Sequence, residues 1–195
     1  MSSRRLIFVG GGVRSGKSEL ALRLARRLGP RRLFVATAEA HDAEMRARIA
    51  QHRNERGSDF ETLEEPFDVP ELLLRIEADV VVLDCLTLWL SNMLCRGDGQ
   101  DGVERHLDAL VAALERRAFD AVVVTNEVGM GVVPETALGR TFRDLSGIAH
   151  QRVGRLADEI YLGALGTMLR LKPGPVVAVD RVLEEETSLS GWTCS

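Results

Sequence analysis

The sequence is poor in the residues that mark secreted, metal-cluster and membrane proteins. Its three cysteines lack C-x-x-C spacing, and they form no metal-binding pattern with the four histidines. No apolar run approaches the roughly 20 residues of a membrane-spanning helix. No apolar segment typical of a signal peptide follows Met1. We therefore expect a cytoplasmic protein with reduced thiols and no membrane span.

The chain also lacks a strong excess of charge of either sign. Its formal net charge is −4 and 45% of its 195 residues are hydrophobic, so neither intrinsic disorder nor a basic surface for nucleic acid is indicated. We expect no nucleic-acid partner. The length suits a single catalytic domain, which we place at residues 1–172. A Pro-Gly-Pro interruption follows Lys172, and residues 173–195 are assigned as a C-terminal tail of unknown role.

One glycine-rich stretch, residues 11–18 (GGVRSGKS), organises the rest of the chain. It follows the apolar run Leu6–Val9 and opens a helical pattern, which is the strand–turn–helix context of the phosphate-binding motif G-x-x-x-x-G-K-[ST]. Glycines let the backbone curl so that successive N–H groups point at one anion. Lys17 adds a positive charge for the β- and γ-phosphates, and Ser18 offers a hydroxyl to Mg²⁺. The alternative is a glycine-rich turn that matches by chance. The predicted nucleotide-binding residues of the loop are Gly11, Gly12, Val13, Arg14, Ser15, Gly16, Lys17 and Ser18.

Short apolar runs separated by helical patterns predict a parallel sheet. These runs are residues 6–9, 33–36, 80–83 and 121–124. We therefore predict an α/β fold: a three-layer P-loop NTPase of the RecA-like type, with a mostly parallel sheet and helices on both faces. Ligands of such sheets lie at the carboxyl ends of the strands. This rule places Ala36, Thr37 and Ala38 near the nucleotide.

A carboxylate ends the third of these runs. Residues 80–83 are followed by Asp84, which is the pattern of a Walker B strand whose aspartate holds Mg²⁺ directly or through water. Apolar runs often end in aspartate, so this pattern is informative only together with the upstream phosphate loop. We predict Ser18 and Asp84 as the magnesium ligands.

The remaining elements are assigned from periodicity and from the positions of glycine and proline. Residues 86–94 are apolar on most sides and predict either a buried helix or an oligomer contact, and residues 96–102 predict a flexible surface loop. Polar residues and glycines at 126–135 predict a loop at the functional edge of the sheet. Further helices are predicted at 19–28, 42–56, 69–76, 103–117 and 138–156. Residues 60–65 predict a short strand or an extended segment, and further strands are predicted at 159–162 and 168–171.

The helix predicted at 42–56 carries a charged row. Glu44, Arg48, His52 and Arg56 recur every four residues, so His52 lies one turn from an arginine on each side. A neutral imidazole is a competent nucleophile toward phosphorus. A lone surface histidine is usually without function, however, and the spacing alone leaves that alternative open.

Several stretches taken together resemble one enzyme family. They are GGxRSGKS at 11–18, AT at 36–37, EMxxRIxxHR at 44–53, TNEVGMGVVPE at 125–135, FRD at 142–144 and, less specifically, DCLT at 84–87. The string at 125–135 is the most distinctive, since phosphate loops occur in many families. Over residues 6–172 the chain is similar to the bifunctional adenosylcobinamide kinase/adenosylcobinamide-phosphate guanylyltransferases of cobalamin biosynthesis.

The resemblance implies two reactions. In the first, the γ-phosphate of ATP or GTP passes to the aminopropanol hydroxyl of adenosylcobinamide. In the second, GTP guanylylates a histidine, which matches His52, and the GMP then passes to adenosylcobinamide phosphate to give adenosylcobinamide-GDP. The resemblance also implies Mg²⁺ as cofactor and a homotrimer as the assembly. No residue of the sequence stands out as a base for the substrate hydroxyl. By similarity the GTP site also includes Arg53, Asn54, Glu55, Arg56, Glu64 and Asp84.

Two other functions are compatible with the motifs. A P-loop kinase of another small molecule would share the phosphate loop and Asp84, and His52 would then be a bystander. A nucleotide-dependent switch or assembly ATPase with the same core would hydrolyse nucleotide under the control of a partner. Covalent labelling of His52 by GTP separates the first alternative from the implied function, and stimulation by adenosylcobinamide separates the second.

Overall fold

The computed structural model describes residues 4–39, 46, 53 and 57–179. The helix predicted at 42–56 falls mostly outside this part of the chain. Its two described residues, Arg46 and Arg53, have helical backbone. The predicted site residues His52, Asn54, Glu55 and Arg56 lie outside the described residues.

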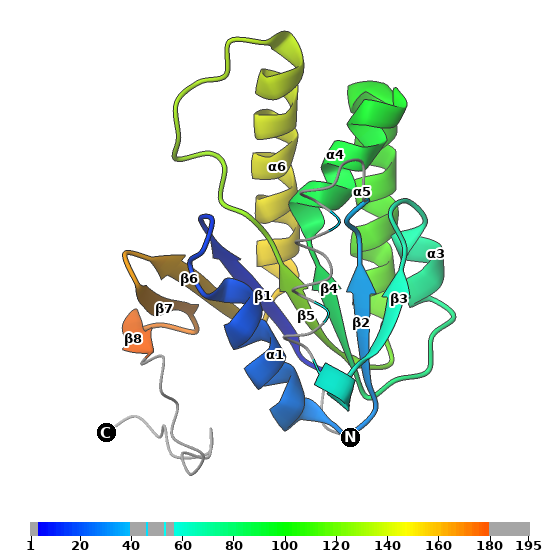
Figure 1. Cartoon of the computed structure of the whole chain (residues 1–195), viewed down its shortest axis with the longest axis vertical. Coiled ribbons are helices and arrows are strands. Elements are labelled where there is room, and N and C mark those ends of the chain that lie inside the picture. The colour runs from blue at the N-terminus through cyan, green and yellow to red at the C-terminus, as the bar shows by residue number, and fades with distance from the viewer. Residues whose placement is uncertain (1–3, 40–45, 47–52, 54–56, 180–195) are drawn as a thin grey trace.

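The described strands form one eight-stranded sheet in the order β3-β2-β4-β5-β1-β6-β7-β8. Neighbours from β3 to β6 in this order are parallel, whereas β7 and β8 join antiparallel. Helix α1 covers one face, and α4, α5 and α6 cover the other (Figure 1). The predicted α/β fold with a mostly parallel sheet and helices on both faces is confirmed. The elements are β1 Leu6–Gly11, α1 Lys17–Leu28, β2 Arg32–Ala36, a 3₁₀ turn Gly57–Asp59, β3 Glu61–Glu64, α3 Val69–Leu73, β4 Val80–Asp84, α4 Leu86–Arg96, α5 Gly99–Arg116, β5 Asp120–Val124, α6 Ala137–Leu156, β6 Glu159–Ala164, β7 Thr167–Lys172 and β8 Val177–Val179.

Each central strand supplies side chains to two cores. In β1, Ile7 and Val9 pack on the α1 side, and Leu6 and Phe8 pack on the side of α4, α5 and α6. A strand that is buried on both faces needs apolar residues at every position, which explains the valine runs of β4 and β5. Because parallel strands end at the same edge, the carboxyl ends of β1, β2, β4 and β5 come together.

Helix α4 packs inside the protein. Trp89, Leu90 and Met93 are fully buried against the sheet and α5. Of the two alternatives for residues 86–94, the buried helix is confirmed. None of the helices in the described part of the chain is both long and apolar enough to cross a bilayer.

The prediction of a flexible surface loop at residues 96–102 is wrong. Gly97 adopts a left-handed conformation (φ 99°), and its N–H donates to the carbonyls of Met93 and Leu94, which ends α4. Asp98 then pairs with Arg96, and α5 begins at Gly99, four residues before the predicted start. Glycine and aspartate serve here as helix caps, and composition alone does not distinguish this use from a loop.

The sheet continues past Lys172. Strand β8 pairs antiparallel with β7, with Val177 opposite Arg170 and Val179 opposite Met168. Part of the segment that was assigned to a tail therefore belongs to the edge of the sheet.

Candidate functional site

The phosphate loop connects the carboxyl end of β1 to the first turn of α1. Gly16 caps α1 in a left-handed conformation (φ 85°), and no side chain accepts a hydrogen bond from the first N–H groups of the helix. Arg14 is also left-handed (φ 55°). The N–H groups of the first helical turn and the positive end of the helix dipole therefore point toward the loop, where they favour an anion.

Lys17 lies inside this loop. The residue is only 9% exposed, and its Nζ donates to the carbonyl oxygen of Gly12 at 3.0 Å. Burial lowers the pKa of Lys17, and the negative charge of Asp84 opposes that shift. A desolvated ammonium group that makes this hydrogen bond to the loop is ready to exchange the carbonyl for a phosphate oxygen.

The loop rests on β6 through Ser15. A Cβ placed on Gly163 would lie 2.9 Å from the Cβ and 3.0 Å from the Oγ of Ser15. A Cβ placed on Gly11 would lie 2.6 Å from the same Oγ. Ser15 Oγ is buried and has no hydrogen-bond partner among the described residues. The close approach of three backbones therefore sets the shape of the loop, and Gly163 is a site residue that the sequence analysis missed.

We expect Gly163→Ala to weaken nucleotide binding by about tenfold. The added methyl group must displace Ser15 or Met168, and overpacking of this kind costs about 1–3 kcal/mol. Nucleotide affinity is measured by titration calorimetry, with Gly147→Ala as the matched control. A Cβ on Gly147, in α6, meets no atom within 4 Å, so this control retains full affinity. Unchanged affinity in Gly163→Ala would show that β6 does not shape the loop.

Asp84 and Thr37 lie at the neighbouring ends of β4 and β2. The Thr37 hydroxyl donates to the carbonyl of Cys85 (2.9 Å) and accepts from its N–H (2.8 Å), while the Thr37 N–H donates to the carbonyl of Asp84. The Asp84–Cys85 peptide is cis. Thr37 is fully buried and Ala36 is 9% exposed, whereas Ala38 is partly exposed. Thr37 thus uses its hydroxyl to hold the backbone around Asp84, and only Ala38 of the three predicted residues presents appreciable surface.

Glu64 lies at the end of β3, at the same edge of the sheet. Its Oε1 is 3.6 Å from Nη2 of Arg53, and both side chains are about 60% exposed. Ion pairs in such solvated positions contribute little stability, so both groups can exchange this partner for a ligand. This contact places Arg53, the residue after His52 in the sequence, at the edge of the sheet.

Polar groups follow the carboxyl end of β5, at the start of the loop predicted at residues 126–135. Asn126 Nδ2 donates to Thr87 Oγ1 at 3.2 Å and lies 3.7 Å from Cys85 Sγ. The N–H of Glu127 donates to the carbonyl of Gly11, the first residue of the loop, at 3.0 Å. Burial raises the pKa of the Cys85 thiol to about 11, so it stays protonated and is no nucleophile.

The described residues contain no cluster of three or more histidine, cysteine, aspartate or glutamate side chains that would hold a resident metal ion. The predicted magnesium ligands Ser18 and Asp84 are a hydroxyl and a carboxylate. Mg²⁺ accepts oxygen donors of this kind and takes its remaining ligands from phosphates and water.

A phosphate loop, a desolvated lysine and an aspartate two strands away define the class of P-loop NTPases. Solved structures agree on a RecA-like fold. The RadB recombinase matches with a TM-score of 0.50 at 17% identity, over 85% of this chain and 79% of that one. An ATPase from the type III secretion system of pathogenic bacteria also matches with a TM-score of 0.50, at 14% identity, over 81% of this chain and 50% of that one.

Within this class, the chain belongs to the cobinamide kinase / cobinamide phosphate guanyltransferase family, whose sequence profile matches residues 7–171. The chain is 40% identical to the bifunctional adenosylcobalamin biosynthesis protein CobP of Pseudomonas aeruginosa, over 85% of this chain and 96% of the relative. It is 37% identical to the bifunctional adenosylcobalamin biosynthesis protein CobU of Salmonella typhimurium, over 86% of this chain and 99% of the relative. The family resemblance expected from the motifs is confirmed.

Proposed function

We propose that this protein phosphorylates adenosylcobinamide with ATP or GTP and then transfers GMP from GTP, through a guanylylated His52, to give adenosylcobinamide-GDP. The observation that carries the proposal is the phosphate loop with the buried Lys17, in a chain whose residues 7–171 match the kinase/guanyltransferase family. Both reactions begin with the binding of a nucleoside triphosphate, and this loop is built to bind one.

In the first reaction the loop positions the triphosphate for attack on its γ-phosphorus. The N–H groups at the start of α1 and the Lys17 ammonium stabilise the charge that spreads over the γ-phosphate oxygens in the transition state. Ser18 and Asp84 would hold a bound Mg²⁺, which neutralises phosphate charge when present. Thr37 holds the backbone of Asp84 in place for this role.

In the second reaction the α-phosphorus of GTP is the target. A nitrogen of the His52 imidazole forms a bond to the α-phosphorus, and pyrophosphate leaves, so that one difficult transfer is divided into two. Arginines of the same segment, Arg53 and Arg56, neutralise phosphate charge with bidentate geometry. Support for this assignment comes from the His-Arg sequence at 52–53 and from the contact of Arg53 with Glu64 at the edge of the sheet.

Three finer expectations belong to the same proposal. The donor set of Ser18 and Asp84 supports Mg²⁺ as the cofactor. The intracellular supply of ATP, GTP and reducing thiols supports work in the cytoplasm. The resemblance alone supports a homotrimer.

The decisive assay incubates the purified protein with adenosylcobinamide, MgCl₂ and ATP, then adds GTP, and follows the corrinoid by mass spectrometry. We expect a mass increase of one phosphate group after ATP and of one GMP group after GTP. A protein that phosphorylates a different small molecule leaves the corrinoid unchanged. Nucleotide hydrolysis that proceeds without any effect of adenosylcobinamide would instead support the switch or assembly ATPase.

A further inference from the structure

A chain of three polar side chains lies at the carboxyl end of β5 and has no role in the function described so far. Thr125 Oγ1 is 2.8 Å from Nε2 of His150, a residue of α6, and Nδ1 of His150 is 3.5 Å from Oε2 of Glu127. The ring of His150 packs edge-on against Phe8 of β1. These groups come from β1, from α6 and from the segment that follows β5, so only the folded chain brings them together.

The solvent exposure of the three side chains shows which of them a substrate can reach. The order of threonine, histidine and carboxylate resembles that of a nucleophilic triad, but Thr125 is only 2% exposed, and a buried hydroxyl attacks nothing. The His150 side chain is 15% exposed and the Glu127 side chain 24%. The Glu127 carboxylate is therefore the end that a ligand reaches.

Glu127 is fixed beside the phosphate loop by its backbone and its carboxylate. Its N–H donates to the carbonyl of Gly11, and its Oε1 accepts from the N–H of Gly129 at 2.7 Å. The Gly129 carbonyl in turn accepts from Nη2 of Arg143, which fastens this turn to α6. A Cβ on Gly129 would lie 2.9 Å from Glu127 Oε1, so glycine lets the turn close on the carboxylate.

The His150 ring is placed to donate a hydrogen bond to the Glu127 carboxylate. Burial lowers the pKa of His150 and the Glu127 carboxylate opposes that shift, so the imidazole is neutral at pH 7. A neutral ring that accepts from the Thr125 hydroxyl at Nε2 carries its proton on Nδ1, which then points to Glu127. Two donors thus hold the carboxylate and leave it further lone pairs for a third.

Asp84 and Glu65, two other carboxylates at this edge of the sheet, have different partners from Glu127. Asp84 faces the Lys17 ammonium and belongs to the predicted magnesium site. Glu65 accepts from the backbone N–H groups of Phe67 and Asp68. Glu127 differs from both because it is attached to the start of the phosphate loop and backed by a histidine.

We propose that Glu127 is the general base of the phosphoryl transfer, with His150 as its positioning residue. The proton of the acceptor hydroxyl moves to the Glu127 carboxylate as the hydroxyl oxygen bonds to the γ-phosphorus. The bond from the γ-phosphorus to the β–γ bridging oxygen breaks, and the nucleoside diphosphate leaves with that electron pair. Glu127 then releases the proton to water. This inference rests on the proposed kinase function and supplies the base that the sequence left unidentified.

The test is Glu127→Gln, which keeps the size of the side chain and removes its basicity. General base catalysis contributes about 10²- to 10⁴-fold, so we expect kcat for adenosylcobinamide phosphorylation to fall about 100-fold or more. The KM for adenosylcobinamide and the Kd for nucleotide stay essentially unchanged. Formation of enzyme-bound GMP from α-labelled GTP also stays unchanged, because that step involves no acceptor hydroxyl.

Glu115→Gln is the matched control, since Glu115 is an exposed carboxylate in the last turn of α5 and has no role in the proposed site; it keeps full kcat. If Glu127→Gln retains most of its kcat, or loses GMP labelling in parallel, Glu127 is not the base. If Glu127→Gln does not fold, Glu127→Asp is used to test the proposal. This variant keeps the carboxylate but shortens the side chain by one methylene group. A large loss of kcat with an unchanged nucleotide Kd supports the proposal, and full kcat overturns it. A wild-type protein that leaves adenosylcobinamide unphosphorylated refutes the proposed function instead.

Discussion

Replacing Lys17 by alanine is expected to abolish both reactions. In the proposed function both reactions use the triphosphate site at the phosphate loop, where the Lys17 ammonium is held by the carbonyl of Gly12 and supplies positive charge. Removing a single preorganised donor from a desolvated site costs about 10²- to 10³-fold in rate, and here the same substitution also weakens ground-state binding of the nucleotide. Corrinoid phosphorylation and GMP labelling from α-labelled GTP should fall together, with nucleotide affinity measured by titration calorimetry.

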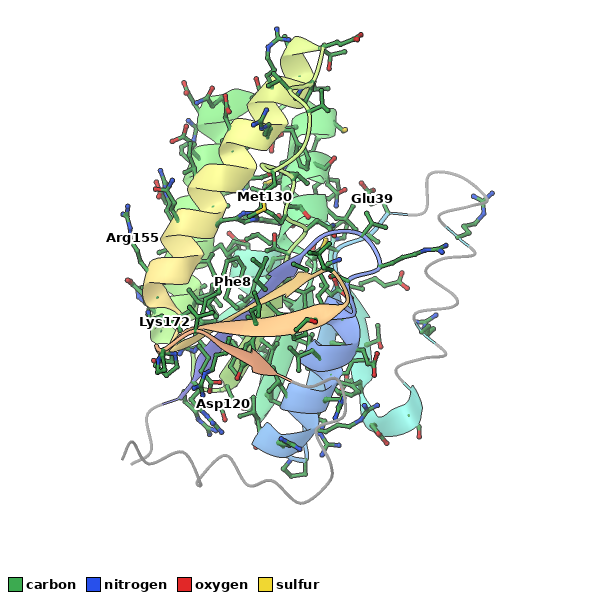
Figure 2. All side chains as sticks on the ribbon, turned by 90° about the vertical axis from the view of Figure 1, so that its left-hand side faces the viewer. Phe8, Glu39, Asp120, Met130, Arg155 and Lys172 are labelled. Carbon is green, nitrogen blue, oxygen red and sulfur yellow. The ribbon has the colours of Figure 1, made fainter. Side chains whose placement is uncertain are left out.

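The fold should survive this substitution. Within the described part of the chain, the hydrogen bond of Lys17 Nζ is to the carbonyl of Gly12, a residue that is exposed to solvent. Lys172→Ala is the natural control, because Lys172 is the only other lysine of the chain. Figure 2 shows it well away from the labelled Glu39 and Met130, which lie at the loop edge of the sheet. Phosphorylation near the wild-type level in Lys17→Ala would mean that the loop does not bind the reacting nucleotide.

Replacing His52 by alanine is expected to eliminate guanylyl transfer while phosphorylation continues. The imidazole is the only group in the proposal that bonds to the α-phosphorus, and alanine offers no substitute nucleophile. The phosphoryl transfer uses the loop, Lys17 and Asp84, none of which His52→Ala alters. A label from α-labelled GTP should therefore disappear from the variant, while ATP-dependent conversion of adenosylcobinamide to its phosphate remains.

The chemistry of the label adds a second readout. A phosphoramidate of histidine hydrolyses in acid and survives alkali, so the wild-type label must show that behaviour. His106→Ala is the control, because His106 lies on α5, near Asp98 and Trp89 and away from the loop. An equal loss of both activities in His52→Ala would assign His52 a structural role. A label that persists in this variant would assign the covalent intermediate to another residue.

Local sequence predicted the phosphate loop and most of the sheet. Glycine spacing, an apolar run before it and a helical period after it are all properties of neighbouring residues, and α1 ends at Leu28 before Gly29-Pro30 as those rules require. The strands β2, β4 and β5 coincide with apolar runs because a strand buried on both faces admits little else.

Composition predicted secondary structure less reliably where one residue type occurs both in loops and in helix caps. The glycines and aspartates at 96–102 resemble a loop, but Gly97 ends one helix and the next begins at Gly99. Which use applies depends on whether α4 and α5 have a surface to pack on, and they bury Trp89 and Leu107 together against the sheet.

The motif at residues 11–18 predicts an anionic ligand, because an anion site at the end of β1 needs only a strand, a glycine turn, a lysine and a helix in that order. The surroundings of the predicted site depend on long-range packing. The contact of Ser15 with Gly163, and the chain from Thr125 through His150 to Glu127, join residues far apart in sequence or on separate elements. Such contacts leave no periodic pattern, because they arise where parallel strands end at a common edge and helices pack across it.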